Sequence, residues 1–228
     1  MAETKQRSEL LLGKETIESL SHKTVLVVGV GGVGGFCVEA LARVGIGHLI
    51  LIDKDVVEIT NVNRQIIATH DTVGQVKVDV FKERIHSIDP DCQVDVYHQF
   101  YDESMNETLD QHTIDYVVDC IDSMKSKEEL ISYCLSRNIP FICSMGMARR
   151  MDPSQLKVME LEKTSYDPMA KRLRNWKRKN KIHKKIMVVA SLEPPVPIEE
   201  KQDLPSTIFV PATAGILLAS ECLRILKI

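Results

Sequence analysis

The stretch from Val25 to Gln65 constrains the fold of this 228-residue chain more strongly than any other. An apolar run, Thr24–Val28, leads directly into the glycine loop GVGGVGG at residues 29–35. A continuous run of β-branched residues and leucine predicts a strand that is buried on both faces. Glycines allow the backbone to turn sharply, to approach a phosphate without a Cβ clash and to enter a helix whose first amides attract anions. The glycines at which we expect a nucleotide are Gly29, Gly31, Gly32 and Gly34.

The residues after the loop complete a crossover unit. A helix is expected at 36–44, ended by Gly45, and a second apolar strand at 48–52. A strand, a helix and a parallel strand form a right-handed crossover. Asp53 follows the second strand, where an acidic side chain commonly meets a ribose hydroxyl. Dehydrogenases, methyltransferases and adenylating enzymes all use a glycine loop of this kind, so the unit alone does not choose between them.

The alternation of strand and helix patterns continues along the chain. Helices are expected within 7–21 and at 77–88 and 126–138, strands at 93–97, 116–121, 141–144, 158–161 and 187–190, and a closing helix ends at residue 226. This order predicts an α/β fold, a doubly wound, mainly parallel sheet with a Rossmann-like nucleotide-binding core. The length favours one domain over residues 1–228, with the core at about 22–146 and a basic and crossover region at 147–228.

Charge and cysteine usage narrow the class of protein. A formal net charge of −3 argues against a wholly basic nucleic-acid binder, though not against a local basic patch. The cysteines are dispersed in apolar runs without zinc-type spacing, which predicts buried free thiols in a reducing cytosol. They are Cys37, Cys92, Cys120, Cys134, Cys143 and Cys222. Neither a signal-type segment nor an apolar run of membrane-spanning length is evident, so we expect a cytoplasmic protein outside membranes.

Polar residues after the second strand favour adenylation. They are Asp55, Asn61, Asn63, Arg64, Gln65 and Lys77. Asp122 ends a later strand and faces the same crevice if the sheet is parallel. Attack of a carboxylate on the α-phosphate of ATP requires cations on the triphosphate, which Arg64 and Lys77 provide, and a magnesium ligand, which Asp122 provides. Hydride transfer requires neither. The alternative is that Arg64 and Lys77 are solvated and that Asp122 caps the next helix.

Several motifs carry a resemblance to known families. GVGGVGG, LIDKDVVEITNVNRQ, TVGQVKVDV and VVDCIDS, in this order, resemble the adenylating superfamily of ubiquitin-activating enzymes and the sulfur-carrier adenylyltransferases MoeB and ThiF, from Arg7 to about Ser144. RSELLLGKE, ALARVGIGHLILID, NVNRQI, SMGMARRMDPSQ and KTSYDPMAKRLR are similar to the tRNA threonylcarbamoyladenosine dehydratases, the TcdA/YgdL family, over nearly the whole chain. The resemblance implies a single ThiF-type adenylating domain.

The resemblance also implies a reaction and roles for matching residues. ATP would adenylate the free carboxylate of threonylcarbamoyladenosine in tRNA, and the carbamoyl nitrogen would then displace AMP to close a hydantoin ring. Because the nucleophile belongs to the substrate, no enzyme cysteine is required, and we expect Cys120 and Cys143 to pack in the core. The implied roles are ribose contact for Asp53, phosphate contact for Asn61, Arg64 and Lys77, magnesium binding for Asp122, and for Arg7 a reach into the partner's site of a homodimer.

A basic run, Lys171–Lys185, contains nine lysines and arginines and no acidic residue. On a chain with net negative charge, this segregation predicts contact with the phosphate backbone of tRNA, and Trp176 is available to stack on a base or to pack on the body. The alternative is a solvated basic helix. The sequence does not decide whether a monovalent cation orders the site or whether a sulfur-transfer partner docks.

Three rival functions stay open at this point. A sulfur-carrier adenylyltransferase would need a groove for the C-terminal tail of a small protein, and many such enzymes have zinc-binding cysteine pairs that this chain lacks. A non-catalytic nucleotide-binding adaptor would not need Arg64, Lys77 and Asp122. A dehydrogenase is the least favoured, because the donors beside the loop have no role in hydride transfer.

Overall fold

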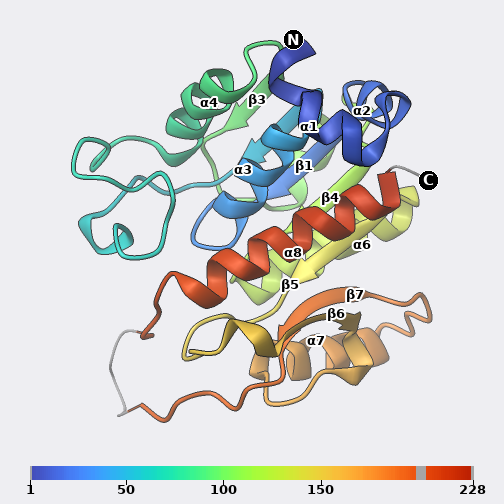
Figure 1. Cartoon of the computed structure of the whole chain (residues 1–228). Helices are drawn as coiled ribbons and strands as arrows, with labels where there is room; N and C mark the ends of the chain where they lie inside the picture. The colour runs from blue at the N-terminus through green and yellow to red at the C-terminus, as the bar shows by residue number, and fades with distance from the viewer. Residues whose placement is uncertain (1, 199–203, 227–228) are drawn as a thin grey trace.

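The computed structural model describes residues 2–198 and 204–226, in which one seven-stranded sheet carries helices on both faces (Figure 1). The helices are α1 Ala2–Leu12, α2 Lys14–Leu20, α3 Gly34–Val44, α4 Lys77–Ile88, α5 Asn106–Leu109, α6 Met124–Arg137, α7 Pro168–Lys179 and α8 Phe209–Leu226. The strands are β1 Thr24–Val28, β2 His48–Ile52, β3 Gln93–Tyr97, β4 Tyr116–Asp119, β5 Phe141–Ser144, β6 Leu156–Glu160 and β7 Met187–Ser191. Short 3-10 turns lie at Ile59–Asn61, Glu103–Met105, Pro153–Gln155 and Leu161–Lys163.

The sheet is doubly wound, as the sequence predicts. Its strand order is β3-β2-β1-β4-β5-β7-β6, and every pair is parallel except β6 with β7. The order reverses between β1 and β4, because the chain first builds outward to β3 and then returns to the other side of β1. In open α/β sheets, such a reversal opens a crevice at the carboxyl ends of the strands.

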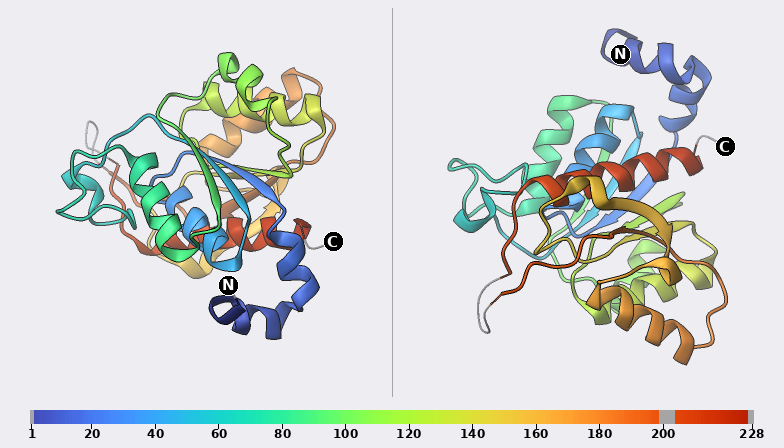
Figure 2. Two further views of the ribbon diagram at one scale, coloured as in Figure 1. Left: turned by 90° about the horizontal axis from the view of Figure 1, so that it is seen from above. Right: turned by 60° about the horizontal axis from the view of Figure 1, so that its bottom comes forward.

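Two hydrophobic cores cover the two faces of the sheet. Alternate residues of β1 point to opposite sides, so that Val25 and Val27 join the core beneath α3, α4 and α8, whereas Leu26 and Val28 join the core beneath α5, α6 and α7. Figure 2 shows these two helical layers from above. A strand buried on both faces needs no polar alternation, which is why the residues from Val25 to Val28, all buried, are apolar.

Helix α8 packs on the face of the sheet that also carries α3 and α4. A Cβ added to Gly215 would lie 2.3 Å from the carbonyl oxygen of Val33, so glycine lets α8 approach the start of α3. Among the described residues, α8 is also the one helix long and apolar enough to cross a membrane. Glu221 and Arg224 interrupt it, so it is not an uninterrupted apolar run. Its buried side chains, including Leu218 and Cys222, belong to the core, as in many core helices.

The predicted elements agree with the structure at most boundaries. The strands at 93–97 and 141–144 and the helix at 77–88 are confirmed, and the N-terminal helices break at Gly13. The strand expected at 116–121 instead ends at Asp119, because the Ile121 amide donates its hydrogen bond to the Asp119 carboxylate at 3.0 Å and not to a neighbouring strand. The strand expected at 158–161 begins two residues earlier, at Leu156.

Candidate active site

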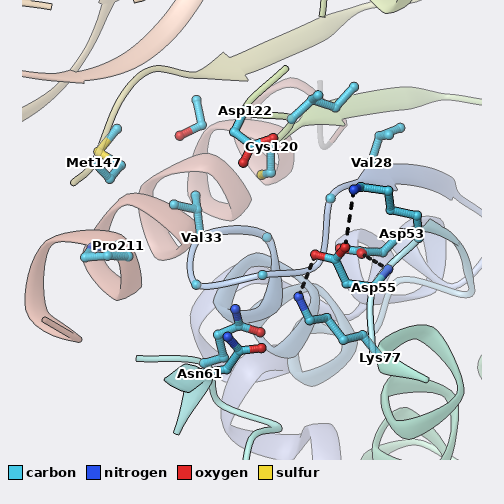
Figure 3. A pocket seen from close by; sticks show the side chains of 18 of the residues that line it. Val28, Val33, Asp53, Asp55, Asn61, Lys77, Cys120, Asp122, Met147 and Pro211 are labelled. Carbon is cyan, nitrogen blue, oxygen red and sulfur yellow. Dashed lines mark hydrogen bonds and ion pairs between the residues drawn. The ribbon is translucent and has the colours of Figure 1, made fainter. Parts of the chain in front are cut away.

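A cavity of about 560 Å³ opens at the carboxyl ends of the central strands, where the strand order reverses (Figure 3). Its volume lies within the range of small-molecule sites, about 300–1,000 Å³. Its walls come from the ends of β1, β2, β4 and β5, the glycine loop, and the segments at 54–65 and 144–148. All predicted nucleotide-binding residues line it: Gly29, Gly31, Gly32, Gly34, Asp53, Asp55, Asn61, Arg64, Gln65 and Lys77.

The four predicted glycines have two different roles. Gly29 has φ +86°, and a Cβ there would lie 2.8 Å from the carbonyl oxygen of Cys120. A Cβ at Gly34 would lie 1.8 Å from the carbonyl oxygen of Gly29, so both positions are closed by the chain itself. At Gly31 and Gly32 the nearest atoms would be 3.7 and 3.5 Å away, ordinary contacts. Glycine at these two positions leaves the cavity open and its backbone accessible to a ligand.

Asp53 holds the glycine loop against the end of β2. One carboxylate oxygen accepts a hydrogen bond from the Val30 amide at 2.7 Å, and the other accepts one from the Asp55 amide at 2.8 Å. Burial raises the pKa of Asp53, and the two amide donors only partly offset that effect. A carboxylate has about four acceptor positions, so Asp53 retains lone pairs for a ligand hydroxyl.

Lys77 enters the cavity from the first turn of α4. Its side chain is buried, and its Nζ lies 2.9 Å from Oδ2 of Asp55, whose own side chain is 48% exposed. The alternative of a solvated Lys77 is therefore wrong. Because Asp55 is open to water at the cavity wall, the ammonium group of Lys77 faces the same space as the glycine loop.

The NVNRQ segment supplies the neighbouring donors and an acceptor without a partner. Arg64 donates from Nη1 to the carbonyl of Thr60 at 2.8 Å and to Oδ1 of Asn63 at 2.9 Å, which folds its guanidinium over this loop. The buried Oε1 of Gln65 has no hydrogen-bond partner among the described residues. Buried polar atoms usually have one, so a ligand atom at this wall would complete the hydrogen bonding of Gln65.

Asp122 stands on the opposite wall from Lys77 and Asn61 (Figure 3). Asp122 is exposed, and it does not cap α6, because the N-cap residue of that helix is Ser123. The helix-cap alternative for Asp122 is therefore wrong. Ser126, from the first turn of α6, also lines the cavity, and its buried Oγ has no partner among the residues described.

Beneath Asp122 lies a buried ion pair that was not foreseen from the sequence. Lys127 donates to Oδ2 of Asp119 at 2.7 Å and to the carbonyl of Ser144 at 3.1 Å, which links the ends of β4 and β5 to α6. Burial by itself lowers the pKa of Lys127, but the Asp119 charge and hydrogen bond outweigh it and the pKa is raised. The available signal was a charged residue inside an otherwise apolar strand, with a lysine eight positions later.

Comparison with known proteins agrees with this geometry. The model of the ThiF family matches residues 5–227. The chain belongs to the ThiF family. Within this ThiF family, a tRNA threonylcarbamoyladenosine dehydratase of Bacillus subtilis is 44% identical over 94% of this chain and 91% of its own length. The predicted resemblance to the dehydratase family is thereby confirmed.

Two solved structures of the Escherichia coli dehydratase TcdA share this fold. The complex with ATP superposes with a TM-score of 0.92 at 35% identity, covering 99% of this chain and 94% of that one. The complex with AMP gives 0.91 at 36% identity, covering 97% and 94%. The predicted Rossmann-like fold is therefore confirmed, and the predicted ATP binding is supported by these ThiF-family complexes.

Arg7 lies outside the cavity of its own chain. It is an exposed residue of α1, and α1 and α2 project from the body in both views of Figure 2. Leu10 and Leu11 of the same helix are 82% and 83% exposed. A role for Arg7 in the site of a second copy remains a prediction.

The six thiols of this ThiF-family chain are free; five are buried, and Cys120 is partly buried against the core. Burial raises the pKa of all six, that of Cys92 to about 12. Cys120 lines the cavity, whereas Cys143 is fully buried and does not. A raised thiol pKa disfavours the nucleophilic thiolate, in agreement with the expectation that the chemistry needs no cysteine.

The basic run Lys171–Lys185 is helical only to Lys179, in α7. Asp167 caps this helix through the Ala170 amide at 2.8 Å and also accepts a hydrogen bond from the Gly146 amide at 2.9 Å, so α7 begins at the cavity wall. Lys177 is buried and paired with Glu162, which corrects its expected place in a free basic surface. Trp176 packs partly on the core. The exposed cations of the run are Lys171, Arg172, Arg178, Lys179, Lys181, Lys184 and Lys185.

Proposed function

We propose that this chain converts threonylcarbamoyladenosine in tRNA to its cyclic hydantoin form, with ATP activating the substrate carboxylate. The observation that most supports this is the cavity at the β1–β4 junction, where Lys77 and Asn61 stand opposite Asp122. A lysine with an amide donor on one wall and a carboxylate on the other suit a magnesium triphosphate, and the chain matches tRNA threonylcarbamoyladenosine dehydratases over most of its length.

In this proposal the residues around the glycine loop bind different parts of ATP. Asp53 accepts hydrogen bonds from the ribose hydroxyls, and the amides of the glycine loop bind phosphate oxygens. Asn61, Arg64 and Lys77 hold the triphosphate, with Lys77 turning from Asp55 to the more strongly charged phosphates. Gln65 supplies a further polar contact through its free Oε1.

The residues present also fit magnesium. Mg²⁺ retains several waters and commonly takes one or two protein carboxylates together with substrate phosphates, so the exposed Asp122 at the cavity wall is sufficient. When bound, the ion neutralises charge on the phosphates. Asp119 and Lys127, buried beneath, keep the Asp122 loop at the end of β4.

The reaction balances with the substrate as its own nucleophile. A carboxylate oxygen attacks the α-phosphorus of ATP, and pyrophosphate leaves. The carbamoyl nitrogen then attacks the activated carbonyl carbon and loses its proton, and AMP departs with the former carboxylate oxygen. The nucleoside loses one water in total, and the enzyme supplies positioning and charge, without a covalent intermediate on a cysteine.

The proposal also covers the oligomeric state, the location in the cell and the tRNA-binding surface. We expect one ThiF-type domain per chain, a cytoplasmic homodimer, and tRNA contact along the exposed cations of Lys171–Lys185. The start of α7 at the cavity wall supports that path, because it connects the basic segment to Gly146. The exposed Leu10 and Leu11 beside Arg7 support dimerisation through α1. A bound monovalent cation and a sulfur-transfer partner are compatible with the fold.

The test is turnover with defined substrates. Purified protein with ATP, magnesium and threonylcarbamoyladenosine-containing tRNA should release AMP and pyrophosphate and give a nucleoside lighter by one water. Asp122→Ala should remain folded and release no AMP, whereas Asp71→Ala, at an exposed carboxylate outside the cavity, should behave as the unmodified protein. Absence of the dehydrated nucleoside under conditions where ATP binds would refute the proposal.

Assays with other ligands distinguish the rival functions. Pyrophosphate exchange that depends on a small protein ending in Gly-Gly, and not on tRNA, would favour a sulfur-carrier adenylyltransferase. ATP binding without turnover of any substrate would favour an adaptor. Tight binding of a nicotinamide cofactor would favour a dehydrogenase.

A further inference from the structure

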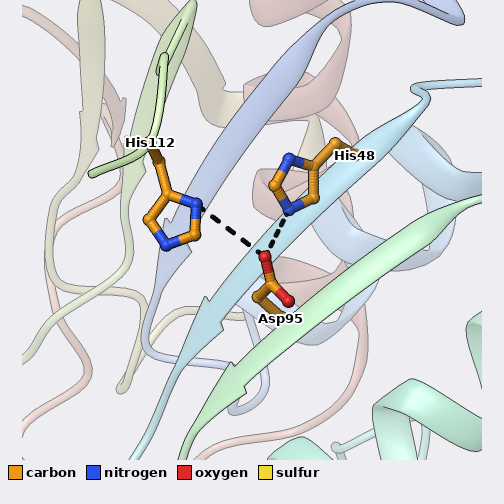
Figure 4. A group of neighbouring side chains, drawn as sticks. All are labelled: His48, Asp95 and His112. Atoms are coloured by element: carbon orange, nitrogen blue, oxygen red, sulfur yellow. Dashed lines mark hydrogen bonds and ion pairs between the residues drawn. The ribbon is translucent and has the colours of Figure 1, made fainter. Parts of the chain in front are cut away.

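Two histidines and an aspartate meet on the sheet face that carries α5, α6 and α7 (Figure 4). His48 is the first residue of β2, Asp95 is in the middle of β3, and His112 lies in the segment between α5 and β4. Nε2 of His48 lies 2.8 Å from Oδ2 of Asp95, and Nδ1 of His112 lies 3.8 Å from the same oxygen. One ligand atom from each of the three side chains lies within 4.8 Å of the other two.

This cluster is separate from the nucleotide cavity. None of its three residues lines that cavity, which begins beyond the carboxyl ends of the strands. The cluster sits nearer the other end of β2, where His48 starts the strand. Its side chains are only partly covered, with 15% of His48, 35% of Asp95 and 19% of His112 exposed, so an ion from solvent has access.

The remaining ring nitrogens of both histidines already have oxygen partners. Nδ1 of His48 lies 3.3 Å from Oγ1 of Thr24, and Nε2 of His112 lies 2.9 Å from the hydroxyl of Tyr97. Metal-binding histidines usually donate their other N–H to an oxygen, which selects the tautomer and orients the ring. Here that arrangement directs Nε2 of His48 and Nδ1 of His112 toward Asp95.

We propose that His48, Asp95 and His112 form a binding site for a divalent transition metal, with Zn²⁺ as the preferred ion. Two imidazoles and one carboxylate are a ligand set that suits zinc, with a fourth position left for water. Ligand atoms about 2.0–2.1 Å from a tetrahedral zinc ion are separated by about 3.3 Å. The observed separations of 2.8 and 3.8 Å lie on either side of that value, and the ligand atoms of His48 and His112 lie within 4.8 Å of each other. Oδ2 of Asp95 also accepts a hydrogen bond from Nε2 of Gln93 at 3.2 Å, which an ion would replace.

The position of the site indicates what the metal would do. β3 is one of the two edge strands and, among the described strands, pairs only with β2. A metal held by these residues joins β3 to β2 and to the segment that enters β4. It therefore stabilises this side of the fold without taking part in the reaction at the nucleotide cavity.

The test is calorimetric titration of the full chain with Zn²⁺ in magnesium-containing buffer, with Co²⁺ absorption as a second probe. One ion per chain should bind. Asp95→Asn and His112→Gln should abolish the site, and Tyr97→Phe should weaken zinc binding about tenfold, as expected when a histidine loses its oxygen partner. His70→Gln, at an exposed histidine outside the cluster, is the matched control and should bind as the unmodified protein.

Thermal unfolding separates loss of the site from loss of the fold. Zinc should raise the Tm of the unmodified protein and of His70→Gln, and should leave that of Asp95→Asn and His112→Gln unchanged. No zinc binding by the unmodified protein, or equal binding by the unmodified protein and all four variants, would overturn the proposal. If Asp95→Asn fails to fold, the titrations of His112→Gln and Tyr97→Phe decide.

Discussion

Two lysine–aspartate pairs lie beside the nucleotide cavity, and they differ in their exposure to solvent. Lys127 and Asp119 are 2.7 Å apart, with 0% and 1% of their side chains exposed. Lys77 and Asp55 are 2.9 Å apart, but the side chain of Asp55 is 48% exposed. The two ion pairs therefore have nearly equal lengths but different exposure to water. The first pair is shielded from water, whereas the second borders the space that a ligand would fill.

The difference predicts a structural role for the buried pair and a ligand-binding role for the half-exposed pair. A charge buried without its partner is strongly unfavourable, so removing either member of the buried pair destabilises the fold. A half-exposed ion pair is screened by water and contributes little to stability, about 0–1 kcal/mol. Lys77 can therefore exchange Asp55 for a phosphate at small cost, while Lys127 cannot leave Asp119.

Lys127→Met tests the buried pair and should have the largest effect. It leaves the Asp119 carboxylate buried and unpaired, and we expect the free energy of unfolding to fall by about 3–5 kcal/mol, measured by denaturant titration. Lys125→Met is the matched control, because its side chain is 82% exposed near Glu129, and should cost less than about 1 kcal/mol. Adding Asp119→Leu to Lys127→Met should restore much of the stability. Equal effects of the two lysine variants would invalidate the comparison.

Lys77→Met tests the half-open pair. We expect the ATP-dependent kcat/KM to fall about 10²–10³-fold, the typical effect of removing one preorganised charge interaction. Unfolding free energy should change by no more than about 1 kcal/mol, because Asp55 stays hydrated. Lys82→Met, at an exposed lysine of the same helix, should alter neither quantity. A stability decrease like that of Lys127→Met, with normal turnover by the folded protein, would show that Lys77 is structural.

The exposed cations of α7 can be compared with these buried lysines, and we expect their removal to have a smaller effect. Arg172→Gln, Arg178→Gln and Lys179→Gln together should weaken tRNA binding and reduce the slope of log K against log[salt] by about 0.7–0.9 for each phosphate that is no longer neutralised by a cation. ATP affinity should not change. The control triple Lys14→Gln, Lys82→Gln and Lys157→Gln removes the same charge at other exposed positions. Equal weakening in both triples would indicate a net-charge effect only.

Lys177→Gln completes this test. Because Lys177 is buried and paired with Glu162, we expect reduced stability and an unchanged salt slope. A reduced salt slope with full stability would mean that Lys177 reaches the nucleic acid.

The sequence correctly predicted which residues around the glycine loop line the cavity, because the signals for them are local. Strand periodicity, a glycine loop and the acidic residue after β2 are separated by short stretches whose geometry is set by one crossover unit. Asp53, Asn61, Arg64, Gln65 and Lys77 all line the cavity for that reason. The pairing of Lys127 with Asp119 and the unpaired Ser126 hydroxyl were missed, because burial of a polar group depends on neighbours from β5 and α6.

The sequence by itself determined the doubly wound sheet, the position of the glycine loop and the residues gathered around it. Only the tertiary structure decided which charges are free. Lys77 and Lys177 are compatible with solvated cations in the sequence but lie buried beside carboxylates, and His48, Asp95 and His112 come together although they are far apart along the chain. Local patterns depend on neighbours along the chain, whereas the state of a charge depends on the water and the partners that folding leaves around it.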